Sequence, residues 1–324
     1  MILLSNNGKE WNRCSAYRSD HNGAKQKVKV NDSSAWHSYF PDISLFLCTV
    51  IWGFSFTAIK DIIGTGVSTV FFIFARFGIA SIIVYPLCRK RLGRLGKEGL
   101  KAGIFLGILL FIGFVTQTRG LLYTTASKSA FITGLSSVFI PIFLFIHKRK
   151  FPEPLVIVAL VVAALGLFLL TGNAVGGFNF GDMLTLICAV SFGAQIYTMG
   201  LVTVKYDSLS LTFVELVTMT VLSAAVLPME NIVFVPNLKL VSVIVIMAII
   251  ATTGTLLVQT WAQKRTSSVR AGLIFCAEPV FAYMFAAVIL GERFNTLQQV
   301  GGAVIIVAIL FSELGPFVLN RRKT

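Results

Sequence analysis

The sequence predicts an all-α integral membrane protein, with ten transmembrane helices arranged as two inverted five-helix repeats. Hydrophobic residues make up 56% of the 324 residues and charged residues only 13%, and the mean hydropathy is +0.82. Soluble proteins carry about 25% charged residues, so this composition indicates a chain largely in contact with lipid. Ten apolar runs joined by short connections, and a similarity between the two halves, complete the prediction.

Each apolar run is long enough to cross a bilayer as a helix, because about 20 residues at about 1.5 Å each span about 30 Å. Strands of a membrane β-barrel would be about ten residues long with alternating polarity. These runs are about twice as long and show no alternation. The expected spans are 42–60, 68–88, 100–123, 127–147, 153–171, 181–201, 208–228, 239–262, 270–291 and 294–314.

Polar segments flank the apolar runs. Residues 1–41 are polar and rich in Lys and Arg, and we expect them to form a disordered cytoplasmic tail. No apolar stretch of signal-peptide type precedes residue 42, so we expect no cleavage. The first repeat is expected over 42–175, the second over 176–315, and a short basic cytoplasmic tail over 316–324.

The distribution of Lys and Arg predicts the orientation. With both termini on one side, the segments on that side hold 22 of these residues and the segments on the other side hold 4. The positive-inside rule therefore places both termini in the cytoplasm, in a multi-pass protein of the inner (cytoplasmic) membrane. The net charge of +14 then belongs to loops beside the lipid bilayer, so we expect no nucleic-acid partner.

The two halves of the chain match at an offset of 142 residues. The matching positions are Gln117-Thr118 with Gln259-Thr260, Lys128 with Arg270, Pro86 with Pro228 and, at a slightly smaller offset, Trp52-Gly53 with Phe192-Gly193. Five spans per half make the halves cross the membrane in opposite directions, as in many secondary transporters. Gln117 and Gln259, as substrate-binding candidates, would then line a central cavity from its two ends.

Two acidic residues lie at mid-depth. Glu278 is the only charge between Ala271 and Leu290, and Pro279 after it lacks the N–H that a regular helix turn needs. A carboxyl group inside a membrane indicates a functional site by default, so Glu278 and Glu215 are candidates for proton coupling. The alternative is that each only fixes helix packing by hydrogen bonds.

Three further residues are candidates for substrate binding. Arg76 could bind a carboxylate through its two-pronged guanidinium group, or it could instead cap backbone carbonyls and position helices. Trp52 and Trp261 offer flat aromatic surfaces, and Trp261 lies two residues from Gln259.

Four stretches resemble the EamA family of the drug/metabolite transporter superfamily. They are Trp52-Gly53-Phe54-Ser55-Phe56, Ala75-Arg76-Phe77, the segment from Gln117 to Pro141, and Ala277-Glu278-Pro279-Val280-Phe281 with Leu290-Gly291-Glu292-Arg293-Phe294. The resemblance covers residues 42–315 and implies a ten-helix carrier of small organic metabolites, commonly exported amino acids and related compounds. Ser137 stands where the family often has proline, and Arg119 is an unexpected charge.

Other functions find little support in the sequence. The three histidines lie in the tail or at a cytoplasmic edge, no cysteine pair forms a ligand motif, and no Walker-type phosphate loop occurs. We therefore expect no enzyme, catalytic residue, metal or cofactor. The alternatives that stay open are an exchanger or uptake carrier for nucleotide-like metabolites and a non-transporting membrane enzyme or assembly protein. The sequence decides neither monomer nor homodimer.

Overall fold

The computed structural model describes residues 17–19, 25–27, 33–149, 154–172, 178–230, 237–293 and 295–321. The chain divides into two units, residues 1–40 and residues 41–324. In the first part β1 (Tyr17–Ser19) pairs antiparallel with β2 (Lys25–Lys27). The other residues of the predicted disordered tail before residue 33, and 322–324 of the second tail, lie outside the described residues.

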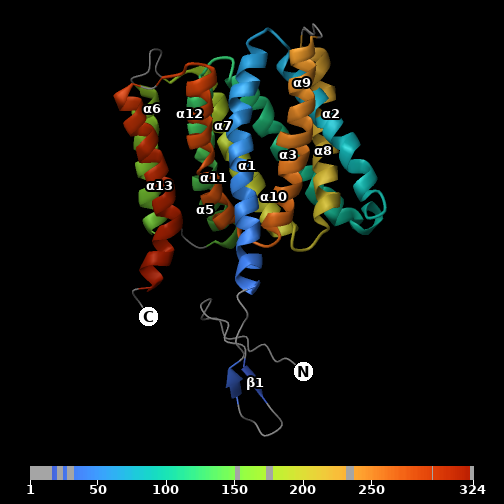
Figure 1. Cartoon of the computed structure of the whole chain (residues 1–324), viewed down its shortest axis with the longest axis vertical. Helices are drawn as coiled ribbons and strands as arrows, with labels where there is room; N and C mark the ends of the chain where they lie inside the picture. The colour runs from blue at the N-terminus through green and yellow to red at the C-terminus, as the bar shows by residue number, and fades with distance from the viewer. Residues whose placement is uncertain are drawn as a thin grey trace. The chain divides into compact units, whose positions relative to one another are not determined.

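The second part is a bundle of helices (Figure 1), and the first of these helices, α1, begins in the sequence of the first part at Ser33. Its elements are α1 (Ser33–Ile63), α2 (Thr69–Cys88), η1 (Leu92–Arg94), α3 (Gly96–Gly120), α4 (Ala126–Gly134), α5 (Ser136–Lys148), α6 (Pro154–Gly172), α7 (Phe180–Val202), α8 (Ser208–Val226), η2 (Leu227–Met229), α9 (Leu238–Ile246), η3 (Met247–Gly254), α10 (Thr255–Gln263), α11 (Ser268–Phe275), α12 (Glu278–Ile289) and α13 (Thr296–Arg321). Each expected span overlaps one helix or consecutive helices, and α1 and α13 extend beyond their expected spans.

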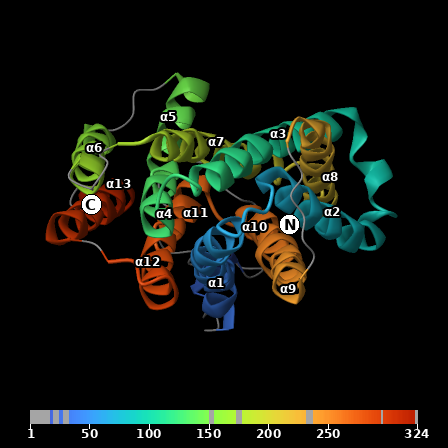
Figure 2. The same cartoon turned by 90° about the horizontal axis from the view of Figure 1, so that it is seen from above.

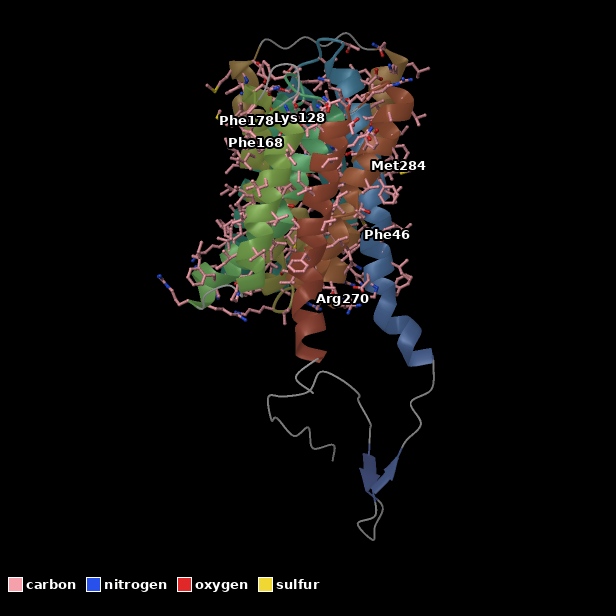
Figure 3. All side chains as sticks on the ribbon, turned by 90° about the vertical axis from the view of Figure 1, so that its left-hand side faces the viewer. Phe46, Lys128, Phe168, Phe178, Arg270 and Met284 are labelled. Carbon is pink, nitrogen blue, oxygen red and sulfur yellow. The ribbon has the colours of Figure 1, made fainter. Side chains whose placement is uncertain are left out.

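Seven helical stretches within the described residues are long and apolar enough to cross a membrane. They are Phe40–Ile63, Thr69–Cys88, Gly96–Gly120, Ala126–Lys148, Phe180–Val202, Ser208–Met229 and Leu238–Gln263. The other three expected spans hold the shorter apolar helices Ile157–Gly166, Glu278–Ile289 and Thr296–Ala308. Carbon-rich side chains such as Phe46, Phe168 and Met284 cover the outside of the bundle (Figure 3), as contact with lipid requires. The all-helical membrane class is confirmed, but the count of ten spans is not.

Two of the expected spans are broken rather than continuous. The span 127–147 is interrupted at Leu135, between α4 and α5, and the span 270–291 is interrupted between α11 and α12. The second break has a local cause, because Pro279 in the first turn of α12 has no N–H to continue the helix before it. The breaks meet in space, since a Cβ on Gly134 would lie 2.9 Å from Pro279 Cγ. At an offset of 142 they are also equivalent positions.

The two repeats run in opposite directions and pack across each other. Lys128 and Arg270, which match in sequence, lie near opposite ends of the bundle (Figure 3). A Cβ on Gly53 of α1 would lie 2.7 Å from Phe281 Cβ in α12, and one on Gly193 of α7 would lie 2.7 Å from the Ser136 carbonyl oxygen in α5. The first helix of each repeat therefore packs closely against the fourth helix of the other.

The equivalent helices α2 and α8, and likewise α6 and α13, lie side by side (Figure 2).

Candidate functional site

A cavity lies between the two repeats. Its lining comes from α1, α3, α4, α5, α7, α10, α11 and α12 and consists of Trp52, Ser55, Phe56, Leu110, Phe114, Gln117, Thr133, Ser136, Phe192, Gln195, Ile196, Leu256, Gln259, Phe275 and Glu278. Its volume, counted as the space open to the centre of a water molecule, is about 60 Å³. One water needs about 10–15 Å³ by this measure, so the cavity has room for a few waters and must widen for a metabolite.

The two glutamines that match between the repeats both line this cavity. Gln117 Nε2 donates to Thr133 Oγ1 at 3.4 Å. Gln259 Nε2 donates to Gln195 Oε1 at 3.3 Å and to Gln263 Oε1 at 3.1 Å. Helices α3 and α10 thus bring equivalent amide groups to the same cavity.

Glu278 lines the same cavity from the first turn of α12. Its side chain is half-buried, and among the described residues no hydrogen bond or ion pair to its carboxyl group is found. The helix N-terminus behind it stabilises a negative charge through the helix dipole. The hydrogen bonds to neighbouring helices that a pure packing role would require are therefore not seen in the described part of the chain.

Glu215 lies behind the cavity wall. Its side chain is fully buried in α8, and its Oε1 accepts a hydrogen bond of 2.8 Å from Gln195 Nε2. Gln195 in turn accepts from Gln259, so the chain of polar groups leads from Glu215 to the cavity. Sequence reasoning missed Gln195, although it follows Gly193 as Ser55 follows Gly53, and both of these polar residues line the cavity.

Trp52 forms part of an aromatic wall. Its indole Nε1 donates to Thr255 Oγ1 at 3.0 Å, and its ring packs edge-on against Phe275 with centroids 5.2 Å apart. Phe114 and Phe192 form a second such pair in the lining, also at 5.2 Å. The cavity therefore combines flat apolar surfaces with amides and one carboxyl group.

Arg76 is not among the residues that line the cavity. Its guanidinium group is buried and donates to Ala251 O at 2.9 Å and to Thr252 Oγ1. These acceptors belong to η3, a π-helical stretch whose wider turn frees backbone carbonyls from regular pairing. The guanidinium also lies 5.1 Å from the Phe114 ring centre. These contacts support the alternative for Arg76, that it caps carbonyls and positions helices.

Trp261 is likewise placed away from the cavity lining. The guanidinium of Arg265 lies 4.3 Å from its ring centre, and Arg265 Nη1 donates to the Trp261 carbonyl at 2.8 Å. Residues two apart on a helix point in different directions, so its closeness in sequence to Gln259 does not bring it to the same face.

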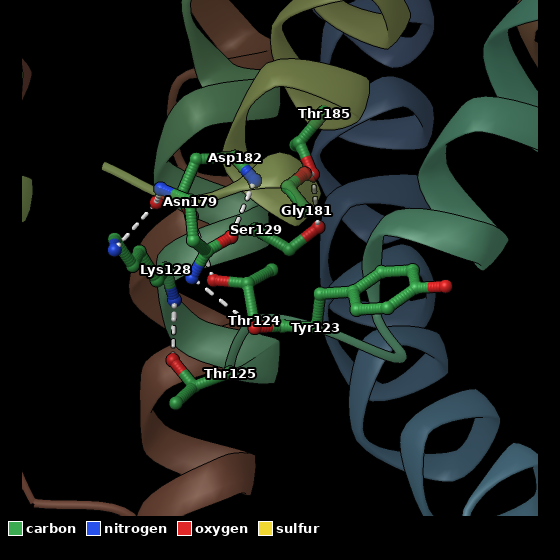
Figure 4. Close-up of polar contacts among 9 residues, drawn as sticks. All are labelled: Tyr123, Thr124, Thr125, Lys128, Ser129, Asn179, Gly181, Asp182 and Thr185. Atoms are coloured by element: carbon green, nitrogen blue, oxygen red, sulfur yellow. Dashed lines mark hydrogen bonds and ion pairs between the residues drawn. The ribbon is translucent and has the colours of Figure 1, made fainter. Parts of the chain in front are cut away.

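A second polar cluster lies where α4 and α7 begin (Figure 4). Lys128 Nζ pairs with Asp182 Oδ2 at 2.6 Å, and Thr124 Oγ1 donates to Asp182 Oδ1 at 2.8 Å. Asn179 and Asp182 cap the first turn of α7 reciprocally. This buried ion pair ties the first repeat to the start of the second.

Two carboxylates of the second repeat cap helices of the first. Glu292 accepts hydrogen bonds from Ala126 N at 2.8 Å and Ser127 N at 3.0 Å, at the start of α4.

Glu230 makes the corresponding contacts at the start of α2, accepting from Val70 N at 3.1 Å and pairing with Arg119 at 2.6 Å. Burial acts to raise the pKa of Glu230, but hydrogen bonds from Ser68, Arg119 and Val70 outweigh it, and the pKa lies below its usual value. Glu230 thus accounts for the unexpected charge of Arg119.

No metal site is apparent in the part of the chain that the structure describes. No three His, Cys, Asp or Glu side chains in it are grouped so that they could hold an ion. The described lining of the cavity offers hydrogen bonding, aromatic contact and the carboxyl group of Glu278.

Comparisons with known proteins agree with a membrane carrier. The EamA-like transporter family matches residues 40–172 and 179–314. A protein of Archaeoglobus fulgidus named as an uncharacterized transporter is 30% identical over 275 residues, which are 85% of this chain and 86% of that protein. The biotin transporter of Escherichia coli K12 is 27% identical over 109 residues, 33% of this chain and 35% of that protein.

A solved crystal structure has the same fold. It superposes with a TM-score of 0.65 at 16% identity and covers 88% of this chain and 99% of that one. At this identity the likeness concerns the fold alone.

Proposed function

The chain belongs to the EamA-like transporter family, and from this premise we propose a ten-helix secondary transporter that moves a small organic metabolite across the cytoplasmic membrane by alternating access. The observation that carries the proposal is the cavity between the repeats, which Gln117, Gln259 and Glu278 all line. Equivalent groups from inverted repeats suit a site that opens to each side in turn.

The cavity chemistry favours an amino acid or a related amine as the substrate, and we propose that it is exported. A primary ammonium group would pair with the Glu278 carboxylate, and the glutamine amides would bind its polar remainder. Among the described residues that line the cavity there is no Lys or Arg, so the several phosphate charges of a nucleotide-like anion would lack a counter-charge, whereas a single carboxylate can accept from amide N–H groups. The aromatic pairs would hold an apolar side chain.

Biotin is a second candidate, favoured by the similarity to the biotin transporter. Its ureido ring has the donors and acceptors that paired glutamine amides complement. Counterflow in liposomes with labelled amino acids, amines, nucleotides and biotin would separate these candidates, and counterflow of any solute would exclude an enzyme or assembly role alone.

The glutamine pair gives a direct test of the cavity. Gln117→Ala and Gln259→Ala are each expected to weaken counterflow about 2- to 10-fold, because each loses one hydrogen bond to substrate. Gln299→Ala, which changes an exposed glutamine on α13, should leave it unaltered. Normal counterflow in both cavity variants would show that the path does not run along α3 and α10.

The number of spans is tested by reporter fusions. Ten spans with cytoplasmic termini predict cytoplasmic signals after Lys101, Lys150, Lys205 and Lys323, and external signals near Gly177 and Lys239. The connection at Gly177 is decisive, because it follows five spans. A cytoplasmic signal there would contradict the ten-span arrangement.

A further inference from the structure

A groove of about 770 Å³ lies on the bundle where α3 packs beside α8. Its walls include the apolar side chains of Leu100, Ile104, Val217 and Val221. Along α8 it runs from Phe213 to Leu222, a rise of about 13 Å, which is close to half the thickness of a hydrocarbon core. Its length therefore matches one leaflet of a bilayer.

The end of the groove at the start of α3 is strongly basic. Lys97 lines the groove itself, and the connection before it holds further exposed cations. The cations of this segment are Arg89, Lys90, Arg91, Arg94, Lys97 and Lys101.

The acids nearby do not neutralise this charge. Glu98 pairs with Lys101 at 2.8 Å, and Asp207 pairs with Arg91 at 3.5 Å. For Arg94 and Lys97, no ion pair is found among the described residues. The apolar groove thus ends at cations that remain available to an anion.

We propose that this groove binds a phospholipid with an anionic headgroup, its acyl chain lying along α3 and α8 and its phosphate at Lys97 and Arg94. A cluster of cations directly beside a transmembrane helix is the pattern that binds anionic lipid headgroups. Lysine suits this place because its aliphatic stem lies on apolar surface while its ammonium reaches the headgroup level.

A second copy of the chain fits the groove less well. A two-fold contact would bring the same basic cluster of each copy together, and like charges in contact are destabilising. An anionic lipid instead supplies the missing opposite charge. This proposal does not depend on the substrate or on the coupling of transport.

Native mass spectrometry of the full-length protein from vesicles of equal phosphatidylglycerol and phosphatidylethanolamine tests the proposal. The wild type is expected to retain phosphatidylglycerol preferentially. Arg94→Gln with Lys97→Gln should reduce that preference about 30-fold, as two headgroup cations are lost. Lys148→Gln with Lys264→Gln removes two exposed cations elsewhere and should leave it unchanged.

A second variant changes the groove without changing the charge. Val221→Trp fills it from its exposed side and should lower the amount of retained phosphatidylglycerol. Equal retention of both lipids by the wild type would overturn the proposal. An unchanged preference in the Arg94 and Lys97 variant, or an equal loss in the control, would also overturn it.

Discussion

Glu278→Gln is expected to abolish accumulation driven by a pH gradient while counterflow at equal pH continues. Glutamine keeps the shape and hydrogen-bonding capacity of the side chain but cannot exchange a proton. Glu278 faces the cavity beside the break between α11 and α12, where a rearrangement could expose it to either side. In Glu278→Gln, half-maximal counterflow should require a higher substrate concentration than in the wild type. The reason is that the charge-assisted hydrogen bond from carboxylate to ammonium is replaced by a hydrogen bond to a neutral amide.

Substrate accumulation is measured in proteoliposomes with an imposed pH gradient. The control is Glu98→Gln, which changes an exposed carboxyl group. Gradient-driven accumulation in Glu278→Gln would make Glu278 a structural residue. A wild type that ignores the gradient would instead be a facilitator or exchanger, and the proposed coupling role would be withdrawn.

The second large effect is expected where the repeats pack across each other. Gly53→Ala and Gly193→Ala should each destabilise the protein by about 1–3 kcal/mol, the usual cost of overpacking. At Gly193 the new Cβ would lie 2.7 Å from the Ser136 carbonyl oxygen, and at Gly53 it would lie 2.8 Å from Ala282 N. Because both contacts involve backbone, a side-chain rotation cannot relieve them.

Thermal unfolding in detergent tests this packing, with Gly78→Ala as the matched control. A Cβ on Gly78 meets only Thr220 Cγ2, at an ordinary 3.7 Å. Alanine favours the helix over glycine by about 0.5–1 kcal/mol, so this variant should be at least as stable as the wild type. If Gly193→Ala shows the same gain, the close contact between α5 and α7 does not hold in the membrane protein.

The sequence predicted the helical elements well because their length and apolarity reflect the bilayer. Breaks within them were harder to predict. Pro279 marks the break before α12, but the equivalent interruption at Leu135 has no proline, and the contact of the preceding Gly134 with Pro279 of the other repeat is not visible in the sequence. The π-helical turn of η3 likewise has no local signal, and its contact with Arg76 comes from helices far apart in the sequence.

For the site, the repeat offset was more informative than residue type. It led to Gln117 and Gln259, which the structure brings to one cavity together with Trp52 and Glu278. Trp261 is not among the residues that line this cavity although it lies two residues from Gln259, because a helix turns neighbouring residues to different faces. Gln195 could have been found by extending the match of Gly53 with Gly193 by two residues.

The most direct test of the account is whether solute passes through this cavity. Ser136, which lines it, can be replaced by cysteine in a variant that lacks the five native cysteines. Counterflow of the solute found in the screen is then measured before and after a polar thiol reagent. We predict that modification stops counterflow and that excess solute slows the modification. Full counterflow after complete modification of the introduced thiol would contradict a path between the two repeats.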